Sequence, residues 1–179
     1  MGESAANVPP HGLPSPWVER FLPLIPESGP TLDLACGSGR HARLLAAAGH
    51  GVLAVDRDPL ALASLADLPG VETRLLDLEG ADWPLTGQRF AGIVVTNYLW
   101  RPRLADLALL LQPGGVLIYE TFMVGNERYG KPANPEFLLR SQELLAFALG
   151  RGMKVVAYEE GFCDWPKPAL RQALCALQP

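Results

Sequence analysis

Short apolar runs alternate with helix-like segments along most of the chain, and this alternation constrains the fold more than any other feature. Strands that are apolar throughout need cover on both faces, which predicts a mostly parallel sheet with helices on either side. We therefore expect an α/β, Rossmann-like, doubly wound sheet of seven strands, the last of them antiparallel. The runs lie at residues 31–35, 52–55, 71–76, 91–96, 116–122, 154–158 and 170–177.

The segments between these runs carry helix signals of their own. Large apolar residues recur at near-helical spacing before Pro26, and an Ala- and Leu-rich stretch ends at Gly49, a typical residue after a helix end. Pro59 is well suited to the first position of a helix because its fixed φ fits that position. The expected helices cover 17–24, 40–48, 59–67, 104–111 and 135–149.

The composition is that of one globular domain. The chain has 179 residues, of which 49% are hydrophobic and 19% are charged, enough to bury a core. The formal net charge of −4 argues against a dedicated nucleic-acid binder, which needs a basic face to neutralise phosphates. We expect a single domain over residues 17–179 after an irregular N-terminal arm at 1–16, where prolines are frequent.

The same composition bears on the compartment. No stretch approaches the ~18 apolar residues of a membrane span, and the N-terminus lacks the layout of a signal peptide. Three scattered cysteines have no metal-ligand spacing, so we expect neither a metal site nor a disulfide framework. Unpaired cysteines are typical of the reducing cytoplasm, and we expect the protein to be located there. We expect no membrane among its partners.

Polar or small residues stand at the carboxyl ends of four of the apolar runs. They are Cys36–Gly37, Asp56, Asp77 and Asn97. In a doubly wound sheet, ligands bind outside these strand ends, near the switch in strand order. These residues come from four different segments, and we expect them to line one crevice.

The glycine-rich turn that follows the first run favours one class of ligand. Residues 37–42 (GSGRHA) match the loose dinucleotide pattern G-x-G-x-x-G/A, and Asp56 lies where a ribose-binding acid belongs. Asp33 lies close beneath this turn, where a carboxylate would repel the pyrophosphate of a nicotinamide dinucleotide. S-adenosylmethionine (SAM) has no phosphate and carries a sulfonium and an ammonium, which a carboxylate attracts. We therefore favour SAM, although Asp33 could also be a turn acid satisfied by local amides.

The sequence around this turn resembles a known superfamily. Residues 31–62 (TLDLACGSGRHARLLAAAGHGVLAVDRDPLAL) resemble the first two motifs of class I SAM-dependent methyltransferases. The likeness continues through 75–79 (LLDLE), 90–98 and 111–117 (LQPGGVL), so it covers roughly 31–121. More loosely, the chain is similar to small bacterial methyltransferases of the tellurite-resistance-like kind. These motifs are specific for the superfamily and not for a substrate.

The resemblance implies an enzyme that moves a methyl group from SAM to an acceptor, and it implies roles for single residues. Asp33 would help hold the ammonium of SAM and Asp56 its ribose, while Asp77 and Leu78 would flank the adenine. Tyr98 would close the site near the reactive methyl. The residues expected to bind SAM are Asp33, Ala35, Cys36, Gly37, Gly39, Asp56, Arg57, Asp77, Leu78 and Asn97.

Methyl transfer from a sulfonium is an in-line displacement with a good leaving group, so the protein contributes mainly by alignment and exclusion of water. A general base is needed only if the nucleophile must lose a proton first. The candidates for catalytic roles are Tyr98, Arg101 and Glu120. Tyr119 and Glu120 point in opposite directions along a strand, and Glu120 is the better candidate because a carboxylate could orient an amine or hydroxyl. An ion pair with a nearby arginine is the alternative role for Glu120.

Other segments at the same edge allow further hypotheses. Residues 97–103 contain two aromatics and two arginines, which favours a pocket for a planar or anionic substrate over simple packing beneath a helix. The turn-rich loop at 123–135 is typical of a substrate-facing lid. His41 follows the glycine turn and is expected to be a surface helix residue rather than a base.

The acceptor is expected to be a small molecule, with nucleic acid unlikely as a partner and the oligomeric state left open. Two other functions remain possible at this point. One is an NAD-dependent oxidoreductase, which would require Asp33 to point away from the turn. The other is a catalytically silent SAM-binding module, which a site with no identifiable base allows.

Overall fold

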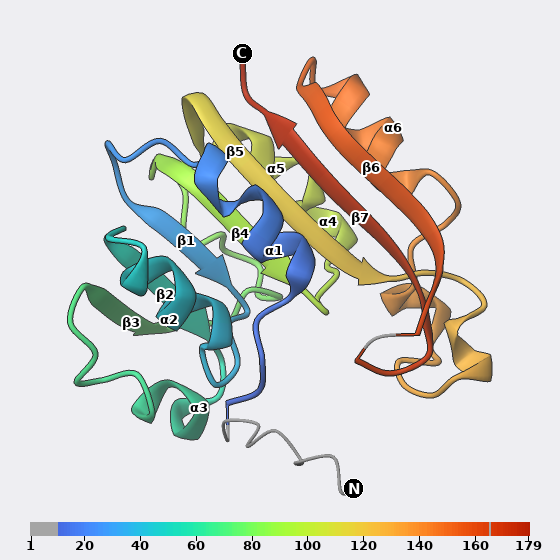
Figure 1. Cartoon of the computed structure of the whole chain (residues 1–179), viewed down its shortest axis with the longest axis horizontal. Helices are drawn as coiled ribbons and strands as arrows, with labels where there is room; N and C mark the ends of the chain where they lie inside the picture. Colours follow the sequence, from blue (N-terminus) through green and yellow to red (C-terminus); the bar gives the residue numbers. More distant parts are fainter. Residues whose placement is uncertain (1–10, 165) are drawn as a thin grey trace, which may run out of the picture.

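A seven-stranded sheet forms the centre of the molecule in a computed structural model that describes residues 11–164 and 166–179 (Figure 1). Its strand order is β3-β2-β1-β4-β5-β7-β6. The strands are β1 (Thr31–Leu34), β2 (Val52–Asp56), β3 (Val71–Leu75), β4 (Phe90–Thr96), β5 (Leu111–Phe122), β6 (Lys154–Cys163) and β7 (Ala169–Leu177). Strands β1 to β5 pair in parallel, and β7 pairs antiparallel with both β5 and β6. The predicted Rossmann-like sheet with an antiparallel last strand is confirmed.

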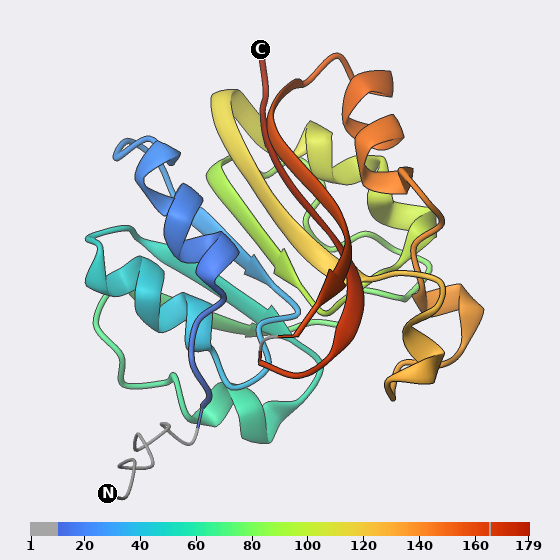
Figure 2. The same ribbon diagram turned by 45° about the vertical axis from the view of Figure 1, so that its right-hand side comes forward.

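Helices cover both faces of this sheet (Figures 1 and 2). Helices α1, α2 and α3 pack on one face, and α5 and α6 pack on the other. Along the described ranges, no helix has the length and apolarity needed to cross a bilayer. The helical elements are α1 (Pro16–Phe21), η1 (Leu22–Leu24), α2 (Arg40–Ala47), α3 (Pro59–Ala63), α4 (Arg101–Leu104), α5 (Asp106–Leu109), η2 (Asn126–Arg128), η3 (Pro135–Phe137) and α6 (Glu143–Gly150).

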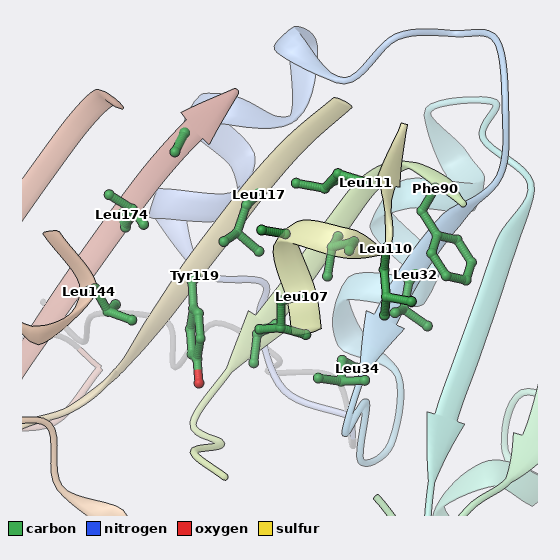
Figure 3. Packing of buried hydrophobic residues seen from close by; sticks show 14 of the residues in the cluster. Leu32, Leu34, Phe90, Leu107, Leu110, Leu111, Leu117, Tyr119, Leu144 and Leu174 are labelled. Carbon is green, nitrogen blue, oxygen red and sulfur yellow. The ribbon is translucent and has the colours of Figure 1, made fainter. Parts of the chain in front are cut away.

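Two hydrophobic cores result, one on each face of the sheet. Alternate residues of β5 divide between them, with Val116 and Ile118 on the α1 face and Leu117 and Tyr119 on the α6 face. Figure 3 shows part of the core on the α6 face. Since full burial of one large apolar side chain contributes about 1.5–3 kcal/mol, these two layers hold the sheet and helices together.

The single helix predicted over 135–149 is wrong in its first half. The segment forms the short η3 and then pairs with the end of β5 before α6 begins. The Leu139 N–H donates to the Phe122 carbonyl at 2.9 Å, and the Val124 N–H donates to the Leu139 carbonyl at 2.9 Å. Gln142 then adopts a left-handed φ of 59° just before α6. Backbone pairing with a distant strand therefore replaces local helix formation in this segment.

Two other predicted helices are shorter or divided. The helix that begins at Pro59 ends at Ala63 and continues as turns. The helix predicted over 104–111 is instead two short helices, α4 and α5, and β5 already begins at Leu111. Of the predicted N-terminal arm, residues 1–10 lie outside the described residues. Residues 11–15 have no regular helix or strand, and α1 begins at Pro16.

Candidate active site

The carboxyl ends of the central parallel strands meet at one edge of the sheet, as predicted. Backbone hydrogen bonds hold these ends together. The Cys36 N–H donates to the Val55 carbonyl at 3.0 Å, which joins the start of the glycine turn to β2. The Asn97 N–H donates to the Glu120 carbonyl at 3.0 Å, which joins the end of β4 to β5.

Two adjoining cavities open at this edge, and together we call them the sheet-edge crevice. The first has a volume of about 180 Å³ and is lined by Ala35, Asp56, Arg57, Leu76, Asp77, Leu78, Glu79 and Tyr98. The second has a volume of about 350 Å³ and is lined by His11, Ala35, Cys36, Gly37, Ser38, Arg40, Thr96, Asn97 and Tyr98. Ala35 and Tyr98 line both, so the two volumes adjoin. Of the ten residues predicted to bind SAM, all but Asp33 and Gly39 line this crevice.

Asp56 holds the glycine turn onto the tip of β2. Its Oδ2 accepts a hydrogen bond from the Gly37 N–H at 2.7 Å, and its Oδ1 accepts one from the Asp58 N–H at 3.0 Å. Within the part of the chain that the structure describes, neither carboxylate oxygen accepts a second hydrogen bond, so each keeps a lone pair for a ligand. The Gly37 amide is already bound to a carboxylate, so this donor is not available for a phosphate group.

Gly39 serves the backbone rather than the crevice. It has a left-handed φ of 76° and occupies the residue before the first turn of α2. A Cβ at this position would lie 2.4 Å from Leu65 Cδ1, which is in the core. The glycine is therefore required by the turn and by the close approach of Leu65.

Asp33 lies beneath the turn, and its side chain does not line the crevice. Only 1% of the residue is exposed, and its Oδ2 is buried without a hydrogen-bond partner among the described residues. Burial raises the pKa of this carboxyl from 3.8 to about 7, against opposing effects from the Ala42 backbone amide and the Arg40 guanidinium. Asp33 is absent from the lining of the crevice, so its predicted role in holding the ammonium of SAM stays a prediction that would act across the turn.

His41 is buried, which corrects the prediction of a surface helix residue. Its Nε2 accepts a hydrogen bond from the Ser15 N–H at 3.1 Å, so the proton resides on Nδ1, 3.3 Å from the Thr96 hydroxyl oxygen. Burial, aided by the charge of Arg40, lowers the pKa of His41 to about 3. The neutral ring thus connects the chain before α1 to the end of β4.

The chain before α1 lies against the glycine turn. The Ser38 hydroxyl donates to the His11 carbonyl at 3.3 Å, and the Arg40 guanidinium donates to the Leu13 carbonyl at 3.3 Å. His11 therefore forms part of the wall of the crevice on the side of Gly37.

Tyr98 and Asn97 line the crevice just after the end of β4. The Tyr98 hydroxyl is buried without a hydrogen-bond partner among the described residues, and burial raises its pKa. The Tyr119 hydroxyl donates to the Tyr98 carbonyl at 2.8 Å from within the core (Figure 3). Tyr119 is thus a core residue, and Glu120 points to the opposite face, in agreement with the alternation expected along β5.

A third cavity of about 400 Å³ lies beside the crevice, on the α1 face of β5, β6 and β7. We call it the β5–β7 cavity. Glu120, Arg171, Trp17 and Phe162 are among its lining residues, and it shares Arg40 and Asn97 with the crevice. Our sequence analysis missed this cavity. Of its lining residues, only Glu120 was among the predicted catalytic candidates, and Arg171, the one charged residue of β7, was a further signal in the sequence.

Arg101 is not brought to any of these cavities, which corrects its assignment as a catalytic candidate. Its Nε and Nη2 donate to the Glu143 carboxylate at 2.7 and 3.0 Å, and its Nη1 donates to the Glu136 carbonyl at 2.6 Å. The hydrogen bonds to Glu143 raise the pKa of Arg101. This fork-like pairing fixes the segment between η3 and α6 to the start of α4.

The substrate pocket expected at 97–103 is also not formed. The space beside Trp100 and Arg103 has a volume of only about 10 Å³. Arg103 donates to the Ala81 carbonyl at 2.6 Å and pairs with Asp106 at 3.3 Å. Both arginines of this segment therefore anchor loops on the α6 side of the sheet.

The loop at 123–135 does not reach these cavities as the expected lid would. It packs against the end of β6 and the start of β7, and the rings of Tyr129 and Phe162 lie 5.5 Å apart. The Leu170 N–H donates to the Asn126 side-chain oxygen at 3.2 Å. No residue of this loop lines the crevice or the β5–β7 cavity. The loop supports the β6–β7 hairpin instead.

Comparison with known proteins identifies the central region. Residues 31–115 match the family model of a methyltransferase domain. Over 52 residues the chain is 44% identical to hemagglutinin 1 of Eikenella corrodens, a match that covers 29% of this chain and 17% of that protein.

Solved structures of methyltransferases share the fold. TehB from Haemophilus influenzae has a TM-score of 0.76 at 19% identity, over 94% of this chain and 63% of that one. The glycopeptide N-methyltransferase MtfA in complex with S-adenosyl-L-homocysteine has a TM-score of 0.62 at 19% identity, over 91% and 88%. The chain thus spans less than two thirds of hemagglutinin 1 and of TehB. The predicted resemblance is thus confirmed as a methyltransferase-domain match over residues 31–115 and as a fold shared with methyltransferases of known structure.

Proposed function

We propose that this chain, which carries a methyltransferase domain within a class I SAM-dependent methyltransferase fold, transfers the methyl group of SAM to a small-molecule acceptor. The observation that carries the proposal is the position of Asp56. Its carboxylate binds the Gly37 amide at 2.7 Å, in the place where a dinucleotide pyrophosphate would need that amide. The turn therefore suits a ligand without phosphates.

The charge of the crevice supports a cationic ligand. Asp56, Asp77 and Glu79 line its first cavity together with one cation, Arg57, which lies 3.5 Å from Glu79. The acids outnumber the cation, so this cavity attracts a ligand with a sulfonium and an ammonium group and repels a nucleotide pyrophosphate. The sulfonium charge is lost during methyl transfer, so these acids favour binding of SAM more than they favour the reaction step.

The lining residues fit the parts of SAM in turn. The remaining lone pairs of Asp56 accept the ribose hydroxyls, and Asp77 with Leu78 lies beside the adenine. The methionine portion occupies the second cavity, where the Arg40 guanidinium faces its carboxylate. Bound SAM supplies an electrophilic methyl group on sulfur. Asn97 and Tyr98 close the crevice where the acceptor approaches, which aligns the nucleophile and excludes water.

Isothermal titration calorimetry with S-adenosylhomocysteine (SAH), NAD⁺ and NADH separates SAM from a dinucleotide. We expect SAH to bind and neither dinucleotide to bind. Tight binding of NADH together with no binding of SAH would identify an oxidoreductase and overturn the proposal. Asp56→Asn should weaken SAH binding by ~1–3 kcal/mol, the range for hydrogen bonds to a charged acceptor. Asp58→Asn, which changes an acid outside the crevice, serves as the matched control.

Catalysis requires a separate measurement, because a silent SAM-binding module would also bind SAH. Incubation with methyl-labelled SAM and a fractionated metabolite extract tests for transfer. Label in any small-molecule fraction, lost in the Asp56→Asn variant, supports the enzyme. Binding of SAH without transfer to any fraction would instead favour the silent module.

A further inference from the structure

The β5–β7 cavity adjoins the sheet-edge crevice at a defined point. Arg40 and Asn97 line both, so a molecule in the cavity of about 400 Å³ would meet the crevice beside Asn97. This volume lies within the range of small-molecule sites, about 300–1,000 Å³. The cavity is therefore placed and sized to hold an acceptor against the methionine end of the crevice.

Most of the charged groups that line this cavity already have partners. The Arg20 guanidinium lies 3.5 Å from the Glu159 carboxylate at the exposed rim. The Glu160 carboxylate accepts hydrogen bonds from the Ser141 hydroxyl at 2.7 Å and from the Gln142 N–H at 2.6 Å. These groups shape the wall and have little capacity left for a ligand.

Arg171 is one of two lining cations that form no ion pair among the described residues. The other, Arg40, donates to the Leu13 carbonyl at 3.3 Å and also lines the crevice, where we have assigned it to the carboxylate of SAM, so Arg171 is left for a second ligand. Its Nη1 donates to the neutral Asn97 side-chain oxygen at 2.7 Å, and its guanidinium lies 4.1 Å from the centre of the Phe122 ring. Its Nε is buried without a hydrogen-bond partner, and among the described residues it forms no ion pair. A cation that is fixed by neutral groups and not neutralised by a carboxylate is suited to bind an anion.

Glu120 is the matching exception among the acids. It lies two residues before Phe122 on β5, opposite Ala173 of β7, and therefore on the same face and next to Arg171. Across residues 11–164 and 166–179, its carboxylate accepts no hydrogen bond and pairs with no cation within ion-pair distance. Its charge nevertheless opposes the effect of burial, which lowers the pKa of Arg171.

We propose that the β5–β7 cavity binds a small amino-acid-like zwitterion as the methyl acceptor, with its carboxylate on Arg171 and its amine on Glu120. This inference rests on the proposed methyltransferase function. Two neighbouring groups of opposite charge, neither of which forms an ion pair among the described residues, match a ligand that carries both charges a few bonds apart. An amine alone or a carboxylic acid alone would leave one of the two groups unpaired in a partly buried site.

The reaction balances with these groups. The acceptor ammonium gives one proton to the Glu120 carboxylate, which exposes the nitrogen lone pair. That lone pair forms the new N–C bond while the C–S bond breaks and its electron pair goes to sulfur. The product leaves as an N-methylammonium together with SAH, and Glu120 returns its proton to solvent.

Matched sets of ligands test the proposal on the full chain saturated with SAH. Each set contains an amino acid, the corresponding amine without the carboxylate and the corresponding acid without the amine. The first set is phenylalanine, phenethylamine and 3-phenylpropionate. The other is leucine, 3-methylbutylamine and 4-methylpentanoate. The remaining standard amino acids are then titrated singly. We expect at least one amino acid to bind at least tenfold more tightly than its amine and acid counterparts, and to accept label from methyl-labelled SAM.

Substitutions assign the two charges. Arg171→Met should weaken binding of that amino acid about 10- to 100-fold and leave the affinity for the amine little changed, while Arg171→Lys should restore part of the loss. Glu120→Gln should weaken binding of that amino acid about tenfold and leave the affinity for the acid without its amine little changed. It should also lower kcat, because the acceptor ammonium loses its proton acceptor, and steepen the dependence of kcat on pH. Arg74→Met and Glu72→Gln change an ion-paired cation and acid on β3, at the other edge of the sheet, and control for net charge. Retained SAH binding shows that each variant is folded.

Three results would overturn the inference. No standard amino acid binds the SAH-saturated protein, or amines are methylated as well as their amino acids, or Arg74→Met costs as much affinity as Arg171→Met. In each of these cases SAH still binds, so the methyltransferase proposal survives. Failure of SAH to bind the unmodified chain would remove both proposals together.

Discussion

Replacement of Asp33 by asparagine should stabilise the protein, because the wild-type structure buries a carboxyl group in a place where its ionised form is disfavoured. The residue is 1% exposed, and burial raises its pKa from 3.8 to about 7. A tenfold change in an ionisation constant corresponds to about 1.4 kcal/mol, so this displacement corresponds to roughly 4 kcal/mol. The buried amide of asparagine has a smaller cost of its own, and we expect a net gain of about 2–4 kcal/mol above pH 7.

The gain should depend on pH in a direction set by proton binding. Between pH 4 and pH 7 the folded protein keeps a proton on Asp33 that the unfolded chain has lost. The folded state thus binds more protons, and its stability falls as pH rises through this window. Asp33→Asn removes this loss, so its advantage over the wild type should be near zero at pH 4, grow up to about pH 7 and then level off.

Urea denaturation of both proteins at intervals from pH 4 to pH 8 measures this difference. Asp67→Asn removes one exposed carboxylate and measures the contribution of net charge alone. The affinity for SAH is measured in parallel, because Asp33 lowers the stability of the protein and such a residue is expected to contribute to ligand binding. An Asp33→Asn variant no more stable than the wild type at pH 8, or a difference that is constant with pH, would refute the reasoning.

Three further outcomes are expected. Burial lowers the pKa of His41 from 6.5 to about 3, so its contribution to stability is present above pH 6.5 and is lost as pH falls toward 3. In urea titrations, His41→Gln should reduce this loss of stability between pH 6.5 and pH 3, and an unchanged loss would contradict the prediction. Gly39→Ala places a Cβ 2.4 Å from Leu65 on a residue with a φ of 76°. It should lower the free energy of unfolding by about 2–3 kcal/mol, which is measured as a lower Tm. A variant as stable as the wild type would show that the turn can relax. Arg101→Lys should speed hydrogen exchange at 136–143 with little effect on SAH affinity, and a tenfold loss of that affinity would return Arg101 to the site.

The parts of the fold that were predicted correctly are those encoded over a few neighbouring residues. Apolar runs gave the strands, and the parallel arrangement then placed Gly37, Asp56, Asp77 and Asn97 at one edge. The signals for the sheet-edge crevice are therefore local ones, repeated on successive strands. Proline and glycine marked the ends of several helices for the same reason.

The parts that could not be predicted depend on contacts between distant residues. Arg101 pairs with Glu143, 42 positions away, and this partner converts a site candidate into an anchor. His41 is buried because Ser15, 26 positions before it, covers the ring. The β5–β7 cavity exists because α1 lies across the sheet, fixed by the Trp17 indole N–H on a carbonyl of β7 157 positions away. Periodicity within a window of sequence carries no information about such pairs.

The antiparallel end of the sheet contributes to the lining of the β5–β7 cavity and not to that of the sheet-edge crevice. The β6–β7 hairpin supplies one wall of the β5–β7 cavity, whereas none of its residues lines the sheet-edge crevice. The two strands pair with each other along their length, and only β7 joins the parallel strands, through β5. A hairpin of altered sequence would therefore change what the cavity admits and leave the lining of the sheet-edge crevice unchanged.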